Sequence, residues 1–323
     1  MQIRRLADCA LLAGACAAVL AGCATNPAAT PATAAASWML PQATSEDLLY
    51  AGATGGNVIY AFSYSTGALV GKIVPPGGTI AIGGLCSDKS GYLYVTALSA
   101  QLHPFVYKYS HGVAGQPIET YRFTPGIAPG GCSVDAATGD LGVPFRSLHN
   151  GGASGVAVFP PGGTYQGRGY FNYTIANYYY CGFDDKGNLF VNGEGYGNQM
   201  YLAELRKGSS TLTNIALNRS ISLSGMGQLQ WDGHSMTIED LTAGALYRFS
   251  VSGVHATVTG ATHLTGWNYP TISWIQGSTL LVPTGTGGTS IGYWKYPAGG
   301  KPTRLLKAPE GVRVVTVSLA ANK

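Results

Sequence analysis

The chain has 323 residues, of which 46% are hydrophobic and only 11% are charged. This composition excludes an intrinsically disordered chain, and a net charge of +4 excludes a strongly basic surface for binding nucleic acid. The 47 glycines and 20 tyrosines favour short strands joined by tight turns, and therefore an all-β fold.

The N-terminal residues 1–22 have the features of a bacterial secretion signal. Met1–Arg5 carries positive charge, and the stretch Leu6–Leu20 is apolar apart from Asp8. Residues 20–23, Leu-Ala-Gly-Cys, resemble the lipobox of bacterial lipoproteins. This resemblance implies that the thiol of Cys23 is acylated and that Cys23 becomes the mature N-terminus.

Membrane attachment through Cys23 is the expected consequence of this resemblance. Acyl chains such as palmitate contribute about 0.8 kcal/mol for each buried CH₂ group. Ala24, in place of Asp, resembles the pattern of lipoproteins exported to the outer membrane. Two alternatives stay open: an ordinary cleaved signal in which Cys23 is incidental, and a weaker lipobox that ends at Cys16.

The remainder of the chain divides into a tether and one folded domain. Residues 23–45 are rich in Ala, Pro and Thr without apolar periodicity, which predicts a flexible tether. Residues 46–321 contain the regular pattern described next, and we expect them to fold as one β-propeller. The whole protein is then a lipid-anchored component of the bacterial cell envelope.

A pattern of alternating apolar and aromatic residues followed by a glycine turn recurs six times. Successive copies are separated by 44 to 50 residues. The copies end at Phe62, Tyr109, Phe159, Leu205, Phe249 and Tyr296. A second pattern, an apolar strand, a turn with Asp or Gly and another apolar strand, has the same period. Together they predict four strands per repeat, which is the size of a β-propeller blade.

The two ends of the repeat region complement each other. The first repeat lacks its innermost strand and begins at Leu48, whereas the chain ends with an additional apolar strand, Val312–Leu319. Pairing of these segments would close the ring and remove its exposed edges. The sequence thus predicts six blades. Segments such as Asp88–Val95 and Asp185–Val191 resemble the blade centre of six-bladed propellers of the NHL-repeat and gluconolactonase-like group.

Asp and Cys residues recur at fixed places in the second pattern. The aspartates precede glycine in each turn, so we interpret them as turn formers rather than calcium ligands. They are Asp88, Asp135, Asp184, Asp185 and Asp232. Cys86, Cys132 and Cys181 share a position that Leu229 and Ile272 occupy in later repeats. We therefore expect a small apolar side chain there, and we predict neither a metal site nor a disulfide.

The loops on one face of the predicted propeller are rich in aromatic and amide side chains. Such side chains suit a polar ligand, a glycan or a peptide, through ring stacking and amide hydrogen bonds. The candidate contacts are Tyr178, Tyr179, Trp267, Asn268 and Tyr269. The alternative for Tyr178 and Tyr179 is that they line the core at the start of an inner strand. The first hypothesis is a noncatalytic module that binds a glycan, a peptide or an envelope protein.

A catalytic role is the second hypothesis, and no residue is assigned to it firmly. Gluconolactonase-like propellers hold a divalent metal with a Glu from an inner strand, and this chain lacks that Glu. His149, Glu194 and Glu239, with Asp240 as the alternative to Glu239, are expected at equivalent loops of successive repeats. They are the candidates for general acid–base chemistry in an envelope hydrolase or lyase. No phosphate-binding loop or Cys-x-x-Cys motif is present, so no cofactor is predicted.

Overall fold

The computed structural model describes residues 36–76, 78–123, 127–149, 152–162, 167–197, 199–221, 226–267 and 272–321. All of them belong to one compact unit, Ala35–Lys323. The predicted signal and the predicted acylation site, Cys23, lie outside the described residues. Among the residues in these ranges, none form a helix long and apolar enough to cross a membrane.

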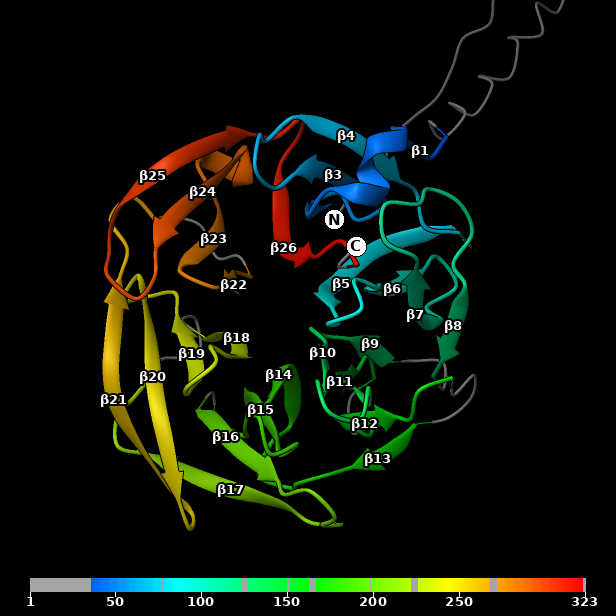
Figure 1. Cartoon of the computed structure of the whole chain (residues 1–323). Coiled ribbons are helices and arrows are strands. Elements are labelled where there is room, and N and C mark those ends of the chain that lie inside the picture. The colour runs from blue at the N-terminus through cyan, green and yellow to red at the C-terminus, as the bar shows by residue number, and fades with distance from the viewer. Residues whose placement is uncertain are drawn as a thin grey trace, which may run out of the picture. The chain divides into compact units, whose positions relative to one another are not determined.

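The folded unit is all-β, and its sheets are arranged in a ring around a central axis (Figure 1). The first sheet contains both the first and the last strand of the unit. From the outside inward it consists of β1 (Trp38–Met39), β4 (Leu69–Ile73), β3 (Ile59–Ser63), β2 (Leu48–Ala53) and β26 (Val312–Ser318).

The next two sheets follow in chain order. The second sheet runs outward through β5 (Thr79–Ser87), β6 (Leu93–Ser99), β7 (Pro104–Tyr109) and β8 (Glu119–Arg122). In the third sheet, two short strands pair with the same partner. Its strands are β9 (Ile127–Pro129) and β10 (Ser133–Val134), then β11 (Leu141–Ser147), β12 (Gly155–Phe159) and β13 (Arg168–Tyr170).

The largest sheet has eight strands and contains two antiparallel meanders. One is β14 (Asn177–Phe183), β15 (Leu189–Glu194), β16 (Met200–Leu205) and β17 (Leu212–Leu217). The other is β18 (Met226–Trp231), β19 (Met236–Asp240), β20 (Ala245–Ser252) and β21 (His255–His263). The outer strands β17 and β21 join the meanders by a short parallel pairing.

The last sheet precedes the closing strand. It consists of β22 (Trp274–Gln276), β23 (Thr279–Thr284), β24 (Ser290–Lys295) and β25 (Gly299–Lys307). Two 3₁₀ segments, η1 (Pro41–Ser45) and η3 (Thr286–Gly288), lie in connections.

Burial differs between strands near the axis and strands at the rim. Every residue of β2 and β6 is buried, whereas residues of β25 alternate between half-buried and exposed. Strands such as β2 and β6 are covered on both faces by neighbouring sheets, so they need continuous apolar sequence. A rim strand is covered on one face only, and its sequence therefore alternates.

The core of the folded unit is divided among the spaces between neighbouring sheets. In the described part of the chain, six clusters of buried side chains fill these spaces. One cluster brings Leu48 and Ile59 of the first sheet against Leu85 and Val95 of the second. Another brings Leu49 of β2 and Val315 of β26 against Leu281 of the last sheet. The packing therefore continues from the last sheet back to the first.

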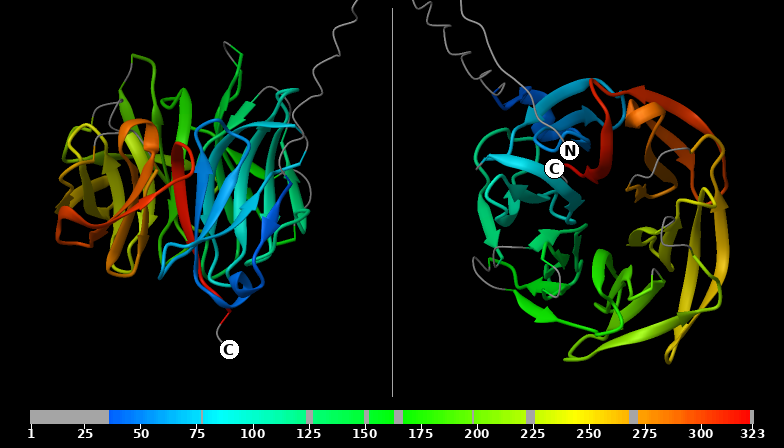
Figure 2. Two further views of the ribbon diagram at one scale, coloured as in Figure 1. Left: turned by 90° about the horizontal axis from the view of Figure 1, so that it is seen from above. Right: turned by 180° about the vertical axis from the view of Figure 1, so that it is seen from behind.

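The last strand of the folded unit, β26, pairs with β2 as the sequence predicts. β2 and β26 are antiparallel, with Leu48 opposite Ser318 and Gly52 opposite Val314. Figure 2 shows β26 (red) beside the blue strands of the first sheet in both views. The Val-rich sequence of β26 suits a strand that is buried on both faces.

The folded unit begins before residue 46. The predicted tether was expected to extend to residue 45, but β1 pairs with β4 and Ala43 of η1 is completely buried. The amide of Leu40 also donates to the carbonyl of Val70, 2.8 Å away. A two-residue strand and a single 3₁₀ turn are too short to produce a periodicity that the sequence would reveal.

The predicted turn-forming role of the aspartates is confirmed at several positions. Asp88 Oδ1 accepts the amides of Ser90 and Tyr92 at 2.9 and 3.0 Å. Asp232 Oδ1 accepts the amides of His234 and Ser235 at 2.8 and 2.7 Å. These bonds occupy the carboxylate within its own turn, as in other Asx turns.

The prediction that the cysteines form no disulfide is wrong for two of them. Cys86 at the end of β5 and Cys132 beside β10 form a disulfide between neighbouring sheets, with Cα atoms 5.6 Å apart. The shared position was correctly identified, but inner strands of adjacent sheets approach closely enough there to be bridged. Cys181 is buried as a free thiol and its Sγ donates to the carbonyl of Gly142 at 3.3 Å.

Candidate functional sites at the two ends of the channel

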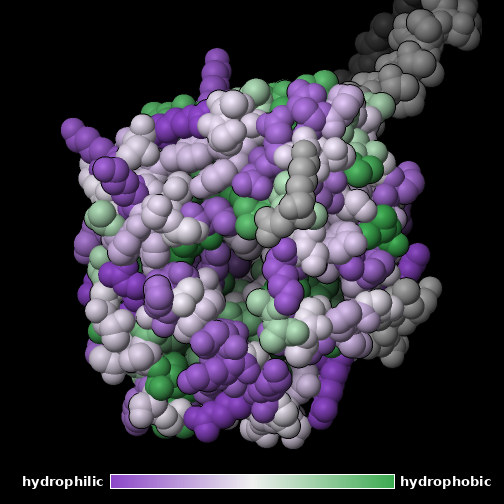
Figure 3. All heavy atoms as spheres, viewed as in Figure 1, coloured by the Kyte–Doolittle hydropathy of each residue, from purple (hydrophilic) through white to green (hydrophobic). Residues whose placement is uncertain are grey.

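The inner strands surround a channel with a cavity at each end. One cavity lies where inner strands begin and the other where they end, and each is named below by the side chains that define it. Figure 3 shows the face of the molecule seen in Figure 1, which is hollowed near its centre. The cavities differ in charge and in aromatic content.

The tyrosine–arginine cavity has a volume of about 330 Å³ and lies where β5, β14 and β26 begin. It is named for Tyr179, Tyr180, Arg146 and Arg313, which line it together with apolar and glycine residues. Both arginines are exposed, and no acidic residue lines the cavity. It therefore offers positive charge beside aromatic rings.

Hydrogen bonds hold Tyr179 in place. Its hydroxyl donates to Glu194 Oε2 at 2.9 Å, and Asn177 Nδ2 donates to the same oxygen at 3.4 Å. The guanidinium carbon of Arg146 lies 5.8 Å from the centre of the Tyr179 ring. Burial, followed by the neighbouring Glu194 carboxylate, raises the pKa of Tyr179. The hydroxyl consequently stays protonated as a donor at physiological pH.

Tyr180 adds a second neutral hydroxyl to this cavity. Burial raises its pKa to about 12, although the positive charges of Arg313 and Arg146 oppose the shift. Its backbone amide donates to Asn192 Oδ1 at 3.2 Å, and Asn192 Nδ2 donates to the carbonyl of Gly227 at 2.8 Å. Asn192 is completely buried, so these bonds fix the inner strand behind the cavity.

Glycine allows the backbone to approach closely in this region. A Cβ atom at Gly130 would lie 2.1 Å from the carbonyl oxygen of Tyr179, and one at Gly83 would lie 2.3 Å from that of Pro129. Only glycine fits at such contacts. The pairs Gly83-Gly84 and Gly130-Gly131, which lie shortly before Cys86 and Cys132, were a sequence signal for this end of the channel.

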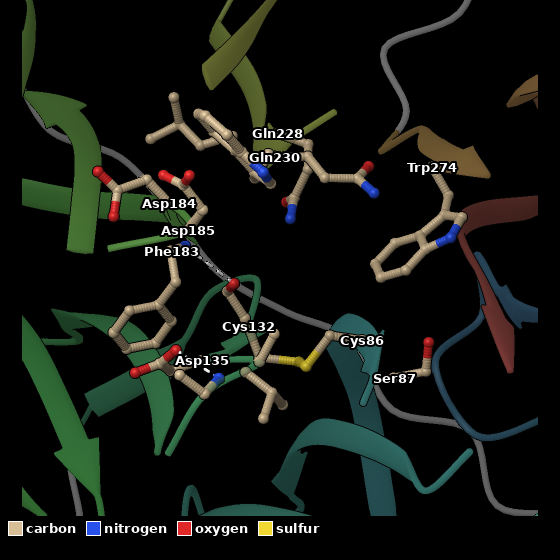
Figure 4. Close-up of a pocket in the computed structure, with 16 residues that line it drawn as sticks. Cys86, Ser87, Cys132, Asp135, Phe183, Asp184, Asp185, Gln228, Gln230 and Trp274 are labelled. Carbon is tan, nitrogen blue, oxygen red and sulfur yellow. Dashed lines mark hydrogen bonds between the residues drawn. A yellow bond between two sulfur atoms is a disulfide. The ribbon is translucent and has the colours of Figure 1, made fainter. Parts of the chain in front are cut away.

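The tryptophan–aspartate cavity has a volume of about 400 Å³ and lies where the inner strands end. It is named for Trp231, Trp274, Asp135, Asp184 and Asp185. Figure 4 shows Trp274 on one side, Asp184 and Asp185 on the other, and the Cys86–Cys132 disulfide in the wall. Of the residues that the structure describes, no Lys, Arg or His lines this cavity.

The predicted binding residues have different surroundings. Tyr178 is completely buried, and its hydroxyl accepts the amide of Asn172 at 2.7 Å and donates to the carbonyl of the same residue at 3.1 Å. It packs in a core cluster with Ile175 and Val191, as the alternative interpretation expects, and it also lines the tyrosine–arginine cavity. Trp267 is half-buried against the core between β20 and β23. Asn268 and Tyr269 lie outside the described residues.

The candidate catalytic residues stand in three different environments. His149 is exposed and lines a separate cavity of about 470 Å³ beside Phe145 and Phe171. Glu194 accepts the hydroxyl of Tyr179, as described above. Within the described residues, no three His, Cys, Asp or Glu side chains gather closely enough to hold a metal ion.

Glu239 is buried between two inner strands. Its Oε2 accepts the amide of Gln228 at 2.9 Å, and its Oε1 accepts the amide of Ser273 at 2.8 Å. Burial raises its pKa to about 7, against the opposing effect of these hydrogen bonds. With 1% of its surface exposed, Glu239 connects β18 to the segment that precedes β22. Asp240, the alternative catalytic candidate to Glu239, is also buried, and its Oδ1 accepts the amide of Ala243 at 3.0 Å.

Comparison with known proteins identifies the fold. No protein-family model matches the chain, and no curated protein matches it. Among solved structures, a protein of unknown function from Bacteroides caccae superposes with a TM-score of 0.58 and 11% identity, over 84% of this chain and 99% of that one. TolB from Acinetobacter baumannii superposes with a TM-score of 0.55 and 11% identity, over 86% of this chain and 68% of that one.

A third structure extends the comparison to an enzyme. The PQQ-bound aldose sugar dehydrogenase from Streptomyces coelicolor superposes with a TM-score of 0.52 and 16% identity, over 76% of this chain and 86% of that one. At such low identity these likenesses bear on the fold and not on the function. The chain is therefore similar to β-propeller proteins in its architecture.

Proposed function

We propose that this protein is a noncatalytic binding module and that the tyrosine–arginine cavity is its ligand site. One observation carries the proposal: two exposed arginines and two tyrosine rings border one cavity, and no acidic side chain of the described residues lines it. Arginine pairs favourably with planar anions, and tyrosine contributes stacking area and a hydrogen bond. The ligand is a polar molecule, a glycan or a peptide, with a carboxylate.

The architecture behind this proposal is a six-bladed propeller. Its supports are the division of the eight-stranded sheet into two meanders and the six core clusters between sheets. In such an arrangement each four-stranded group is one blade, and β26 supplies the innermost strand of the first blade. The cavity then lies on the axis, where several inner strands contribute to it.

Anchoring of the propeller to the bacterial envelope is part of the same proposal. Its support is the lipobox-like sequence that ends at Cys23, followed by Ala24, which favours the outer membrane. Mass spectrometry of the mature N-terminus tests this directly. A mature chain that begins at Cys23 and carries acyl chains is expected, whereas an unmodified N-terminus elsewhere would contradict it.

Binding is tested by pairs of ligands that differ only in charge. D-glucuronate and D-glucose differ by one carboxylate, and acidic peptides are compared with their amidated forms. We expect saturable binding of at least one carboxylate member in isothermal titration calorimetry and none for its neutral partner. Arg313→Gln should weaken that binding about 10- to 100-fold, since a charge-assisted hydrogen bond contributes about 1.5–3 kcal/mol.

Arg168→Gln is the matched control for this experiment. Arg168 is exposed like Arg313, but it lies on the outer strand β13, where its guanidinium is 5.2 Å from the centre of the Tyr170 ring. Equal affinity losses in both variants, or equal binding of the neutral partner, would contradict the proposed site.

A further inference from the structure

The tryptophan–aspartate cavity is lined by three aspartates. Asp135 and Asp184 use carboxylate oxygens in their own turns: Asp135 Oδ1 accepts the amide of Ala137, and Asp184 Oδ1 accepts that of Lys186, both at 2.9 Å. Asp185 is exposed and makes no hydrogen bond or ion pair with any described residue. Three carboxylates thus border a cavity that no cationic side chain of the described residues lines. On their other side, Asp184 and Asp185 also line a neighbouring cavity with basic residues, among them Arg206.

A buried amide at the same cavity has an unused hydrogen-bonding atom. Gln228 is 4% exposed, and its Oε1 has no partner among the described residues. Figure 4 shows the side chain reaching from β18 toward the middle of the cavity. Leaving such an oxygen unpaired is unfavourable. Rotation of the side-chain amide exchanges the positions of Oε1 and Nε2. In the rotated form Oε1 can accept a hydrogen bond from a ligand in the cavity.

Two indole rings complete the lining. Trp231 ends β18 and Trp274 begins β22, and both are half-buried at the cavity. Indole is the aromatic side chain that attracts cations most strongly over its face. Aromatic faces, acceptor atoms and negative charge therefore coincide in one place.

We propose that the tryptophan–aspartate cavity is a second ligand site, which binds a molecule bearing a primary ammonium group. An ammonium donates hydrogen bonds and accepts none, so it matches Gln228 Oε1 and the Asp185 carboxylate. Its charge offsets the carboxylates, and its CH₂ groups pack against the indoles. A neutral sugar would stack on the indoles equally well but would leave the negative charge unbalanced.

This site is separate from the one proposed for the module's function. The tyrosine–arginine cavity takes a carboxylate where the inner strands begin, and the tryptophan–aspartate cavity takes an ammonium where they end. Neither proposal requires the other to hold, because the two sets of lining residues share no member.

Intrinsic tryptophan fluorescence tests the proposal, because two of the chain's 5 tryptophans line the cavity. The probe is spermidine, titrated at about 20 mM salt and again at about 0.3 M, where screening weakens exposed charge pairs. We expect a saturable fluorescence change that requires several-fold more spermidine at high salt. Glucose and acetate at equal concentration should give none.

Three variants localise the effect. Asp185→Asn should weaken spermidine binding about threefold, and Trp274→Phe by a similar factor. Gln228→Met should weaken it about fivefold while leaving the thermal unfolding midpoint at or above that of the wild type, since an unpaired buried oxygen is removed. Asp140→Asn is the matched control: it removes the same charge from a residue that does not line the cavity, and affinity should stay within about twofold.

Several results would overturn the proposal. They are no saturable response to spermidine up to about 10 mM, a response to glucose of equal strength, or equal losses in Asp185→Asn and Asp140→Asn. A response that persists unchanged in Gln228→Met and Trp274→Phe would place the amine elsewhere on the surface.

Discussion

At the scale of single residues, Glu239 shows how one carboxyl group can connect two sheets. The register shift between Met226 and Leu229 of β18 interrupts the pairing with β19. The carboxylate of Glu239 accepts a backbone amide of this interrupted stretch, that of Gln228. A Cβ at Gly227 would lie 2.0 Å from Glu239 Oε2, so glycine is required beside the carboxyl. The repeat pattern placed Glu239 in a loop, whereas it lies inside β19 with both carboxylate oxygens engaged in hydrogen bonds.

Burial of Glu239 makes stability depend on pH. Its pKa rises from 4.5 to about 7 on folding, so the folded protein holds this proton more tightly than the unfolded chain does. The resulting stabilisation is fully present below about pH 4.5 and is lost as pH rises to about 7, a change of about 3 kcal/mol in the free energy of unfolding.

Urea unfolding at several pH values between 4.5 and 8 measures this contribution. Glu239→Gln cannot titrate at this position. The unfolding free energy of the wild type, minus that of the variant, should therefore fall by about 3 kcal/mol as pH rises from 4.5 to 7. Glu310→Gln serves as the control, because the Glu310 carboxylate accepts only the exposed hydroxyl of Tyr60 at 2.7 Å. Parallel pH profiles for wild type and Glu239→Gln would refute the assignment.

At the scale of elements, the pairing of β26 with β2 joins the two ends of the folded unit. Val312, Val314, Val315 and Val317 of β26 are all at most 2% exposed. Their removal would uncover β2 along its length and open two core clusters. Each valine that loses its burial lowers the free energy of unfolding by about 1.5–3 kcal/mol. The sum over the four valines is comparable to the whole stability of an ordinary domain, about 5–15 kcal/mol.

A chain that ends at Ala308 is therefore expected not to fold. Far-ultraviolet circular dichroism and gel filtration should show loss of cooperative unfolding and aggregation through the free edge of β2. A control that lacks only residues 322–323, beyond β26, should unfold like the full chain. A monomeric truncated protein with a cooperative transition would contradict the closing role of β26.

The sequence predicted elements better than contacts between them. Apolar periodicity, Asp–Gly turns and the Val-rich terminal strand identified the strands and the β2–β26 pairing, because these features are local or repeat at fixed intervals. The disulfide was missed because it depends on how closely the inner strands of two sheets approach. The tyrosine–arginine cavity was predicted in part: Tyr179 lines it, but Arg146 and Arg313 come from distant segments that only the ring brings together.

At the scale of the whole molecule, the two ends of the channel carry opposite charges. Arginines border one end and aspartates the other, while buried inter-sheet hydrogen bonds such as that from Thr96 Oγ1 to the carbonyl of Gly130, 2.6 Å long, hold the inner strands between them. The Cys86–Cys132 disulfide lies in this same framework and covalently joins the second sheet to the third.

The disulfide should make a measurable contribution to the stability of the whole ring. It closes a loop across a sequence separation of 46 residues, for which the chain-entropy model gives about 4 kcal/mol. Dithiothreitol should therefore lower the free energy of urea unfolding of the wild type by about 3–4 kcal/mol. The effect should persist in Cys181→Ala, which removes only the free thiol, and should vanish in Cys86→Ser/Cys132→Ser. If dithiothreitol destabilises the double variant as much as the wild type, reduction of the Cys86–Cys132 disulfide is not the cause of the destabilisation.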